Sequence, residues 1–95
     1  MKKVLAIVED EYVVRLVQVT LERQGYNVVV ARSAVDAREK ALLERPDLVV
    51  LDETTAEGLE ALRMLREDAA TCGIPVIHLK QTKKRGRGGQ GSVSI

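Results

Sequence analysis

Four short hydrophobic segments alternate with three longer helix-forming segments along this 95-residue chain. The short segments are nearly continuous runs of aliphatic residues, which is typical of strands buried on both faces of a parallel sheet. These predicted strands cover residues 4–8, 27–31, 48–52 and 74–79. The longer segments predict helices over residues 11–24, 34–45 and 58–68. Strands and helices that alternate with short links indicate right-handed βαβ units, and therefore an open parallel sheet of the α/β class.

Residues at the ends of the predicted helices support these boundaries. Gly25 supplies the left-handed conformation that commonly follows a helix, and Pro46 prevents the second helix from continuing. Ser33 is a predicted N-cap of that second helix. In the first helix, Val14 and Val19 lie off the stripe formed by the other hydrophobic positions. These two valines belong either to a wide buried face or to an exposed contact patch.

The pattern of strands and helices ends after Leu79. Residues 80–91 contain no apolar residue and hold four of the seven glycines, so they cannot form a packed helix. The last four residues alternate between serine and aliphatic side chains, which is compatible with a short fifth strand. We therefore expect one domain over residues 1–80 and a basic, glycine-rich tail over residues 81–95.

Length and composition narrow the classes of function. The chain is long enough for one small domain, and no apolar run approaches the ~20 residues that span a bilayer. The short apolar stretch after Lys3 is not a signal-peptide core, so a cytoplasmic protein is expected. Cys72 is the only cysteine, which excludes an intrachain disulfide. The only aromatic residues, Tyr12 and Tyr26, argue against nucleic-acid binding by stacked aromatic side chains.

The net charge of +1 conceals two oppositely charged regions. Up to Asp68 the chain has 14 acidic and 10 basic residues, a net charge of −4, whereas five basic residues and no acidic one follow Asp68. Such a tail is either a solubilising end or a basic arm that binds phosphate groups weakly and without sequence preference. We do not expect a nucleic-acid partner or a membrane partner.

Acidic residues directly follow two of the predicted strands. Residues 9–11 (Glu-Asp-Glu) follow the first strand, and Asp52 ends the third. Ligands of open parallel sheets gather beyond the carboxyl ends of the strands, so Glu9, Asp10 and Asp52 converge if these two strands are neighbours. Three carboxylates repel one another unless a cation joins them, and their oxygens suit Mg²⁺. The alternative is that residues 9–11 form only an acid-rich helix start.

Five segments occur in an order that points to one family. They are residues 4–11 (VLAIVEDE), 25–26 (GY), 46–52 (PDLVVLD), 58–60 (GLE) and 74–77 (IPVI). This ordered set resembles the receiver domain of bacterial two-component response regulators. The resemblance implies a flavodoxin-like, CheY-like sheet with the strand order 2-1-3-4. It also implies that Asp52 accepts a phosphoryl group from a sensor histidine kinase, which is the role of a signalling domain and not of an enzyme.

The same resemblance implies a Mg²⁺ site around Asp52. By this resemblance Asp10 binds the metal directly, Glu9 holds it through a water molecule, and Thr54 contributes its main-chain carbonyl. The carboxylate of Asp52 would attack phosphohistidine while Mg²⁺ neutralises charge on the transferred group.

Two departures from the family pattern concern the site itself. The loop between Asp52 and the third helix is shorter than in the family, which puts the position of the Thr54 carbonyl in doubt. Lys80 stands where receivers carry a serine or threonine that contacts the phosphoryl group, so Lys80 is a candidate partner of the phosphate or of Asp52. His78 is expected to be a packed or edge residue of the fourth strand.

The chain also departs from the family after the fourth strand, where receivers continue through a fourth helix, a fifth strand with a phosphate-contacting lysine, and a fifth helix. We therefore expect a truncated, single-domain response regulator. The alternative is a phosphorylation-incompetent module that keeps the receiver fold and acts by interaction or dimerisation. An uncovered fourth strand predicts a homodimer through that edge, and Val14 with Val19 forms the alternative contact.

Overall fold

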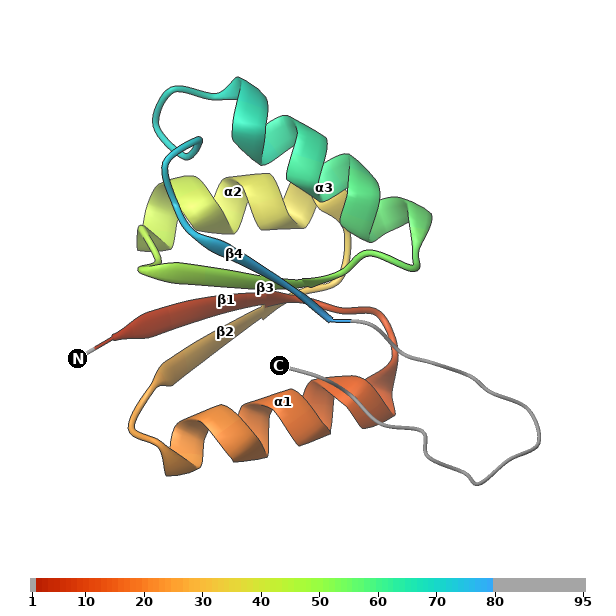
Figure 1. Cartoon of the computed structure of the whole chain (residues 1–95), viewed down its shortest axis with the longest axis vertical. Helices are drawn as coiled ribbons and strands as arrows, with labels where there is room; N and C mark the ends of the chain where they lie inside the picture. Colours follow the sequence, from red (N-terminus) through yellow and green to blue (C-terminus); the bar gives the residue numbers. More distant parts are fainter. Residues whose placement is uncertain (1, 80–95) are drawn as a thin grey trace.

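Four parallel strands form one sheet in the computed structural model, which describes residues 2–79 (Figure 1). The strands are β1 (Lys3–Ile7), β2 (Asn27–Ala31), β3 (Leu48–Asp52) and β4 (Val76–Leu79), in the spatial order β2-β1-β3-β4. The helices are α1 (Glu11–Arg23), α2 (Ala34–Glu44) and α3 (Ala56–Glu67). All three strand pairings are parallel, so the predicted α/β class and strand order are confirmed.

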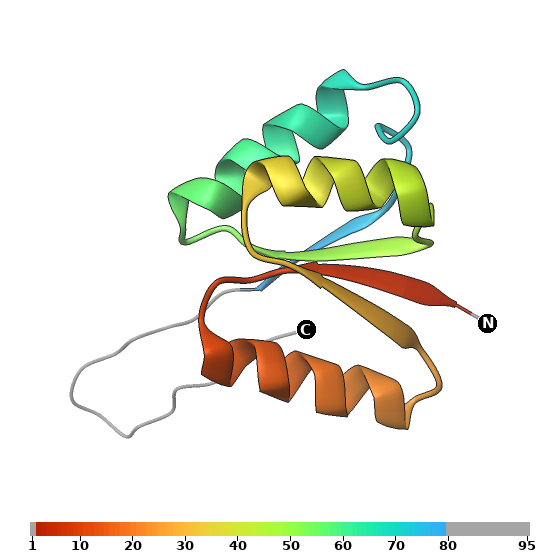
Figure 2. The same ribbon diagram turned by 180° about the vertical axis from the view of Figure 1, so that it is seen from behind.

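The helices cover both faces of this sheet. Helix α1 lies against one face, while α2 and α3 lie next to each other against the other face (Figure 1, and from behind in Figure 2). Alternate residues of a strand point to opposite faces. In β1, Val4 and Ala6 belong to the core under α1, whereas Leu5 and Ile7 belong to the core under α2 and α3. Because both faces are buried, residues 4–7 of β1 are apolar without interruption.

The two faces are packed with side chains of different size. Helix α1 buries larger residues, namely Val13, Val14, Val17 and Leu21. Helix α2 buries only alanines, at positions 34, 37 and 41. Alanine has too small a side chain to fill a wide interface, so α2 can approach the sheet closely. Its leucines Leu42 and Leu43 remain exposed instead.

The two valines that lie off the main stripe of α1 differ in burial. Val14 is 6% exposed and belongs to the buried face, whereas Val19 is 51% exposed. Leu16, which the helical spacing assigns to the core stripe, lies at its margin with 37% of its surface exposed. A contact between chains through Val14 is therefore a wrong prediction, because its side chain is part of the core.

The helix ends follow local sequence signals. The Ser33 side chain accepts a hydrogen bond from the Asp36 N–H (3.1 Å), which confirms Ser33 as the N-cap of α2. Gly25 adopts a φ of 93°, the left-handed conformation expected after α1. Helix α3 begins earlier than predicted, at Ala56, because the Thr55 hydroxyl caps it by accepting a hydrogen bond from the Gly58 N–H (3.0 Å).

Strand β4 begins later than predicted. The N–H of Ile74 donates to the Thr71 carbonyl in a turn (3.1 Å), and Pro75 has no N–H to donate. The strand therefore starts at Val76. The predicted tail, including the possible fifth strand, lies outside the described residues. Within residues 2–79, no helix combines the length and the apolar character needed to cross a membrane.

Candidate functional site

Asp52 is a buried carboxylate at the carboxyl end of β3. Its exposed fraction is 3%, and its neighbours in the sheet are β1 on one side and β4 on the other. In the register of β3 with β4, Asp52 is paired with Leu79. A buried carboxylate is costly unless hydrogen bonds or a cation compensate its charge. The surroundings of Asp52 therefore determine what this end of the sheet can do.

The loop after β3 turns back onto Asp52. The Thr54 N–H donates a hydrogen bond to Oδ1 of Asp52 (2.9 Å), and the Thr54 hydroxyl donates to the same oxygen (2.5 Å). No hydrogen bond within residues 2–79 ends on the second oxygen, Oδ2. Thr54 thus fixes the orientation of the carboxylate from one side. The resemblance implies only a carbonyl role for Thr54, although an aspartate side chain commonly accepts a hydrogen bond from the N–H two residues on.

Glu9 and Asp10 lie at the same end of the sheet. Strands β1 and β3 are paired with Ile7 opposite Leu51, so the residues that follow β1 lie beside the end of β3. Both acidic side chains are exposed, and Oδ1 of Asp10 accepts a hydrogen bond from the Tyr12 N–H (2.9 Å) at the start of α1. The two strands are neighbours, as predicted. The alternative prediction, an acid-rich start of the first helix, also agrees with the structure, because Asp10 caps α1 and Glu11 lies in its first turn.

The donor set at this end consists of oxygen atoms, which are the ligands that Mg²⁺ prefers. As the side chains stand, no three acidic, histidine or cysteine residues within 2–79 are gathered closely enough to hold a metal ion. Glu9 and Asp10 are exposed and can rotate, and Oδ2 of Asp52 accepts no hydrogen bond from the described residues. The residues therefore fit a Mg²⁺ ion in their chemistry, provided that the two exposed side chains turn toward Asp52.

The sequence did not predict one contact that borders this site, between the residue after β3 and a residue of β4. Nδ1 of His78 lies 3.1 Å from Oε1 of Glu53, the residue after Asp52. The His78 side chain is 37% exposed, and no further strand flanks β4 among the described residues, so the expected edge position of His78 is confirmed. The sequence carries no signal for this contact, because it depends on the strand register that places His78 opposite Leu51.

The first turn of α3 holds the Asp52 loop against the sheet. A Cβ atom at Gly58 would lie 2.0 Å from the Asp52 carbonyl oxygen, so only glycine allows this approach. The Thr55 hydroxyl donates to the same carbonyl (3.3 Å). Oε1 of Glu57 accepts a hydrogen bond from the Ala34 N–H (2.7 Å) and so joins α3 to the start of α2. Lys80, the remaining candidate residue, lies outside the described residues.

The fold and this end of the sheet together define a class of protein. A parallel sheet in the order 2-1-3-4, with a buried aspartate at the end of β3 and acidic residues after β1, is the arrangement of a receiver domain. The family model for the response regulator receiver domain matches residues 4–87, and the chain belongs to this family. It is therefore related to the response regulators of two-component systems, whose receiver domains are signalling domains and typically use Mg²⁺ at the phosphorylation site.

Individual relatives agree with this assignment. The chain is 41% identical over 68 residues to the alkaline phosphatase synthesis transcriptional regulatory protein PhoP of Bacillus subtilis, covering 70% of this chain and 28% of PhoP. It is 34% identical over 78 residues to the polar-differentiation response regulator DivK of Brucella anthropi, covering 80% of this chain and 63% of DivK. The chain thus spans less than two thirds of the length of these curated relatives.

Solved structures show the same fold. The N-terminal domain of a response regulator receiver protein from Methanoculleus marisnigri superimposes with a TM-score of 0.80 at 30% identity, covering 90% of this chain and 71% of that domain. The match supports the assignment of the fold.

Proposed function

We propose that this chain is the phosphoacceptor of a two-component phosphorelay and that Asp52 receives a phosphoryl group from a sensor histidine kinase. The observation that carries the proposal is the Asp52 carboxylate, which is 3% exposed and whose two hydrogen bonds from Thr54 both end on Oδ1. Oδ2, which accepts no hydrogen bond from residues 2–79, is the proposed nucleophilic oxygen. Buried nucleophiles held in one orientation need little reorganisation before they react.

The proposed step is a transfer of one phosphoryl group. A carboxylate oxygen of Asp52 attacks phosphorus, the P–O bond forms, and the P–N bond of phosphohistidine breaks. The electron pair of that bond stays on the imidazole nitrogen, so the kinase histidine leaves as a neutral ring once it holds one proton. Little covalent chemistry falls to the receiver, because transfer depends mainly on position and on charge compensation.

Two cationic partners belong to this proposal. Mg²⁺, held by Asp10, by Glu9 through water, by Asp52 and by the Thr54 carbonyl, would neutralise negative charge on the transferred group. Lys80 follows Leu79, which is paired with Asp52 in the register of β3 and β4. Lys80 would pair with the phosphoryl group, or with Asp52 before transfer, in place of the hydroxyl that the family carries.

The kinase needs a surface next to the site, and α1 offers one. Tyr12, Leu16 and Val19 are 74%, 37% and 51% exposed and are spaced as one stripe along the helix. The stripe starts two residues after Asp10, so a protein that covers it reaches the acidic end of the sheet. We propose this stripe as the docking surface of the kinase.

Phosphoramidate, a small donor with a P–N bond, tests the proposed transfer. The full chain incubated with phosphoramidate and Mg²⁺ should gain the mass of one phosphoryl group. Asp52→Asn should gain none, whereas Asp36→Asn, which changes an exposed aspartate on α2, should react like the unchanged chain. Equal labelling of the Asp52→Asn chain would contradict the proposal.

A second copy of the chain is the proposed partner of the β4 edge. The Pro75 carbonyl accepts from the Val49 N–H (2.9 Å), and alternation along a strand turns the main-chain groups of Val76 and His78 the other way. No strand of residues 2–79 meets these groups, and Val76 and Ile77 are only half-buried. Two β4 edges related by a twofold axis would satisfy both sets of groups.

Light scattering at micromolar concentration tests the dimer. The unchanged chain and His78→Ala should be dimeric, because His78→Ala keeps the outward N–H. His78→Pro removes that N–H without touching the β3 ladder and should be monomeric. A monomeric unchanged chain would contradict the dimer. A dimer in which Asp52 is never labelled would instead favour the alternative function, an interaction module without phosphotransfer.

A further inference from the structure

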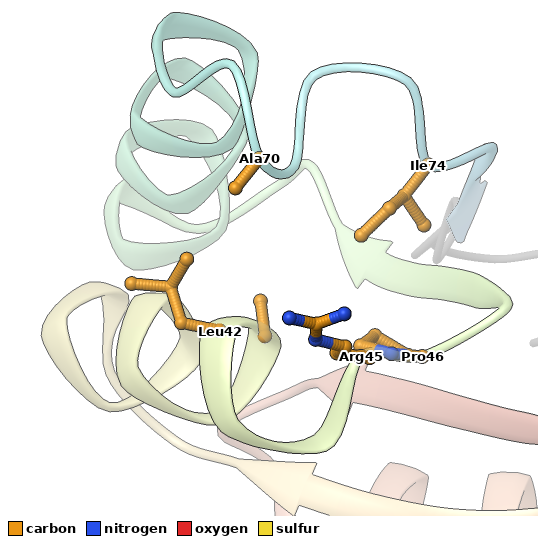
Figure 3. A pocket seen from close by; sticks show the side chains of 6 residues that line it. Leu42, Arg45, Pro46, Ala70 and Ile74 are labelled. Carbon is orange, nitrogen blue, oxygen red and sulfur yellow. The ribbon is translucent and has the colours of Figure 1, made fainter.

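A hollow of about 380 Å³ lies at the end of the sheet opposite Asp52. It opens between the end of α2 and the loop that precedes β4, and its walls are mainly apolar (Figure 3). The lining residues are Ala41, Leu42, Arg45, Pro46, Ala70 and Ile74. Its size lies in the range of small-molecule sites.

The guanidinium of Arg45 points into this hollow, between Leu42 and Ile74 (Figure 3). Within residues 2–79, Arg45 makes no ion pair and its side chain makes no hydrogen bond. The main chain of Arg45 is left-handed, with φ 49° and ψ 62°, and it is the only non-glycine residue of the described chain with a positive φ. An arginine in this conformation is strained, because its Cβ crowds the main chain. Arg45 is the C-cap of α2, and a left-handed residue commonly ends a helix.

Neither of the neighbouring acidic side chains forms an ion pair with Arg45. Oε1 of Glu44 lies 2.8 Å from Nζ of Lys3, and Oδ2 of Asp47 accepts a hydrogen bond from the Lys3 N–H (2.9 Å). Lys3 thus engages both acids that flank Arg45 in the sequence. The hollow therefore combines one positive charge, on the exposed side chain of Arg45, with aliphatic side chains beside it, which is complementary to an anion with an aliphatic body.

We propose that this hollow binds a small aliphatic carboxylate. The planar carboxylate would form two parallel hydrogen bonds with the Arg45 guanidinium, and the hydrocarbon chain would lie against Leu42, Pro46 and Ile74. A single cation suits one carboxylate better than a phosphate group, which carries more charge than Arg45 alone compensates. The proposal is independent of phosphotransfer, because the hollow and Asp52 lie at opposite ends of the strands.

Titration with hexanoate, followed by ¹⁵N–¹H NMR of the full chain, tests the proposal. We expect shifts of the Leu42, Arg45 and Ile74 amide signals with a dissociation constant of about 1 mM, as is usual for so small a ligand. 1-Hexanol, which has the same chain without the charge, should bind at least about tenfold more weakly. Asp52→Asn should bind hexanoate like the unchanged chain.

Arg45→Asn is the decisive variant, because asparagine tolerates the left-handed conformation but carries no guanidinium. It should lose hexanoate binding at least about tenfold, and Arg45→Gly, which relaxes the same backbone, should behave alike. Arg38→Gln, a matched change on the same helix, should leave binding unchanged. Equal binding of hexanoate by the unchanged chain and both Arg45 variants, or equal binding of hexanol and hexanoate, would overturn the proposal.

Discussion

The two ends of the sheet are built from the same strands but differ in charge and in how that charge is compensated. At the carboxyl end, Asp52 is buried and held by Thr54, while Glu9 and Asp10 lie beside it. At the amino end, Lys3 engages both nearby acids and Arg45 remains without an ion pair among the described residues. One end therefore carries an excess of carboxylates, whereas the other carries an arginine that has no ion pair within residues 2–79.

This difference follows from the architecture of a parallel sheet, in which aliphatic residues fill the strand interiors and charged residues lie at the strand ends. The strand interiors of β1 and β3 are uniformly aliphatic, because both faces are buried. The charged residues lie at the first or last position of these strands or directly beside them. All carboxyl ends of parallel strands meet at one edge, so a few residues after β1 and β3 are sufficient to build an anionic site.

Gly58→Ala should have the largest effect on the free energy of unfolding and should disturb only the carboxyl end of the sheet. The new Cβ would lie 2.0 Å from the Asp52 carbonyl oxygen, so α3 or the end of β3 must shift. We expect a loss of about 2–3 kcal/mol in the free energy of unfolding, measured by urea titration. Gly73→Ala is the matched control, because no atom lies within 4 Å of its added Cβ. A loss of equal size in both variants would show that the close approach at Gly58 is not the cause.

Thr54→Ala should have a smaller effect, also at the carboxyl end. It removes the hydroxyl that donates to Oδ1 of Asp52 and keeps the N–H bond. We expect a loss of about 1 kcal/mol in unfolding free energy, reduced because Thr54 is exposed. We also expect slower labelling of Asp52 by phosphoramidate. Thr54→Ser retains a hydroxyl and should restore both quantities; a serine variant as slow as the alanine variant would contradict the role of the hydroxyl.

The sequence predicts the strands and their order well, because uninterrupted aliphatic runs such as residues 48–51 fit few other structures. It also predicts that Asp52 ends a buried strand, as the structure has it, while the role of Asp52 in a site stays a prediction. It does not predict the Glu53–His78 pair or the Gly58 approach, because both depend on the register between β3 and β4 and on the exact seat of α3. The start of α3 was misplaced because Thr55 was not recognised as a cap.

Arg45→Gly, at the amino end of the sheet, should raise the free energy of unfolding instead of lowering it. Glycine adopts a φ of 49° without strain, and part of that gain is offset by the larger entropy of glycine in the unfolded chain. We expect a net stabilisation of about 0.5 kcal/mol by urea titration. A destabilised Arg45→Gly chain would show that the side chain contributes more to packing than its strained backbone costs.

Arg63→Gln, away from both ends, should have the smallest effect. Its hydrogen bond to the Glu60 carboxylate holds the pKa of that carboxyl below its ordinary value, and Arg63 also pairs with Glu67. A lowered folded-state pKa adds stability above the unfolded pKa, and this contribution is lost as the pH falls through the folded value. Because Glu60 is exposed to solvent, we expect Arg63→Gln and the unchanged chain to have the same Tm at acidic and at neutral pH. A clear pH-dependent difference would contradict this.

Chemical mapping of the phosphorylated residue tests the central claim most directly. An acyl phosphate on aspartate is reduced by borohydride to the side chain of homoserine, which mass spectrometry locates in a peptide. After treatment of the full chain with phosphoramidate and Mg²⁺, we predict homoserine at position 52 and at no other aspartate, and a strong decrease in Asp10→Ala. Homoserine at other positions, or none at position 52 while the chain remains folded, would contradict the assignment of this end of the sheet as a phosphoacceptor site.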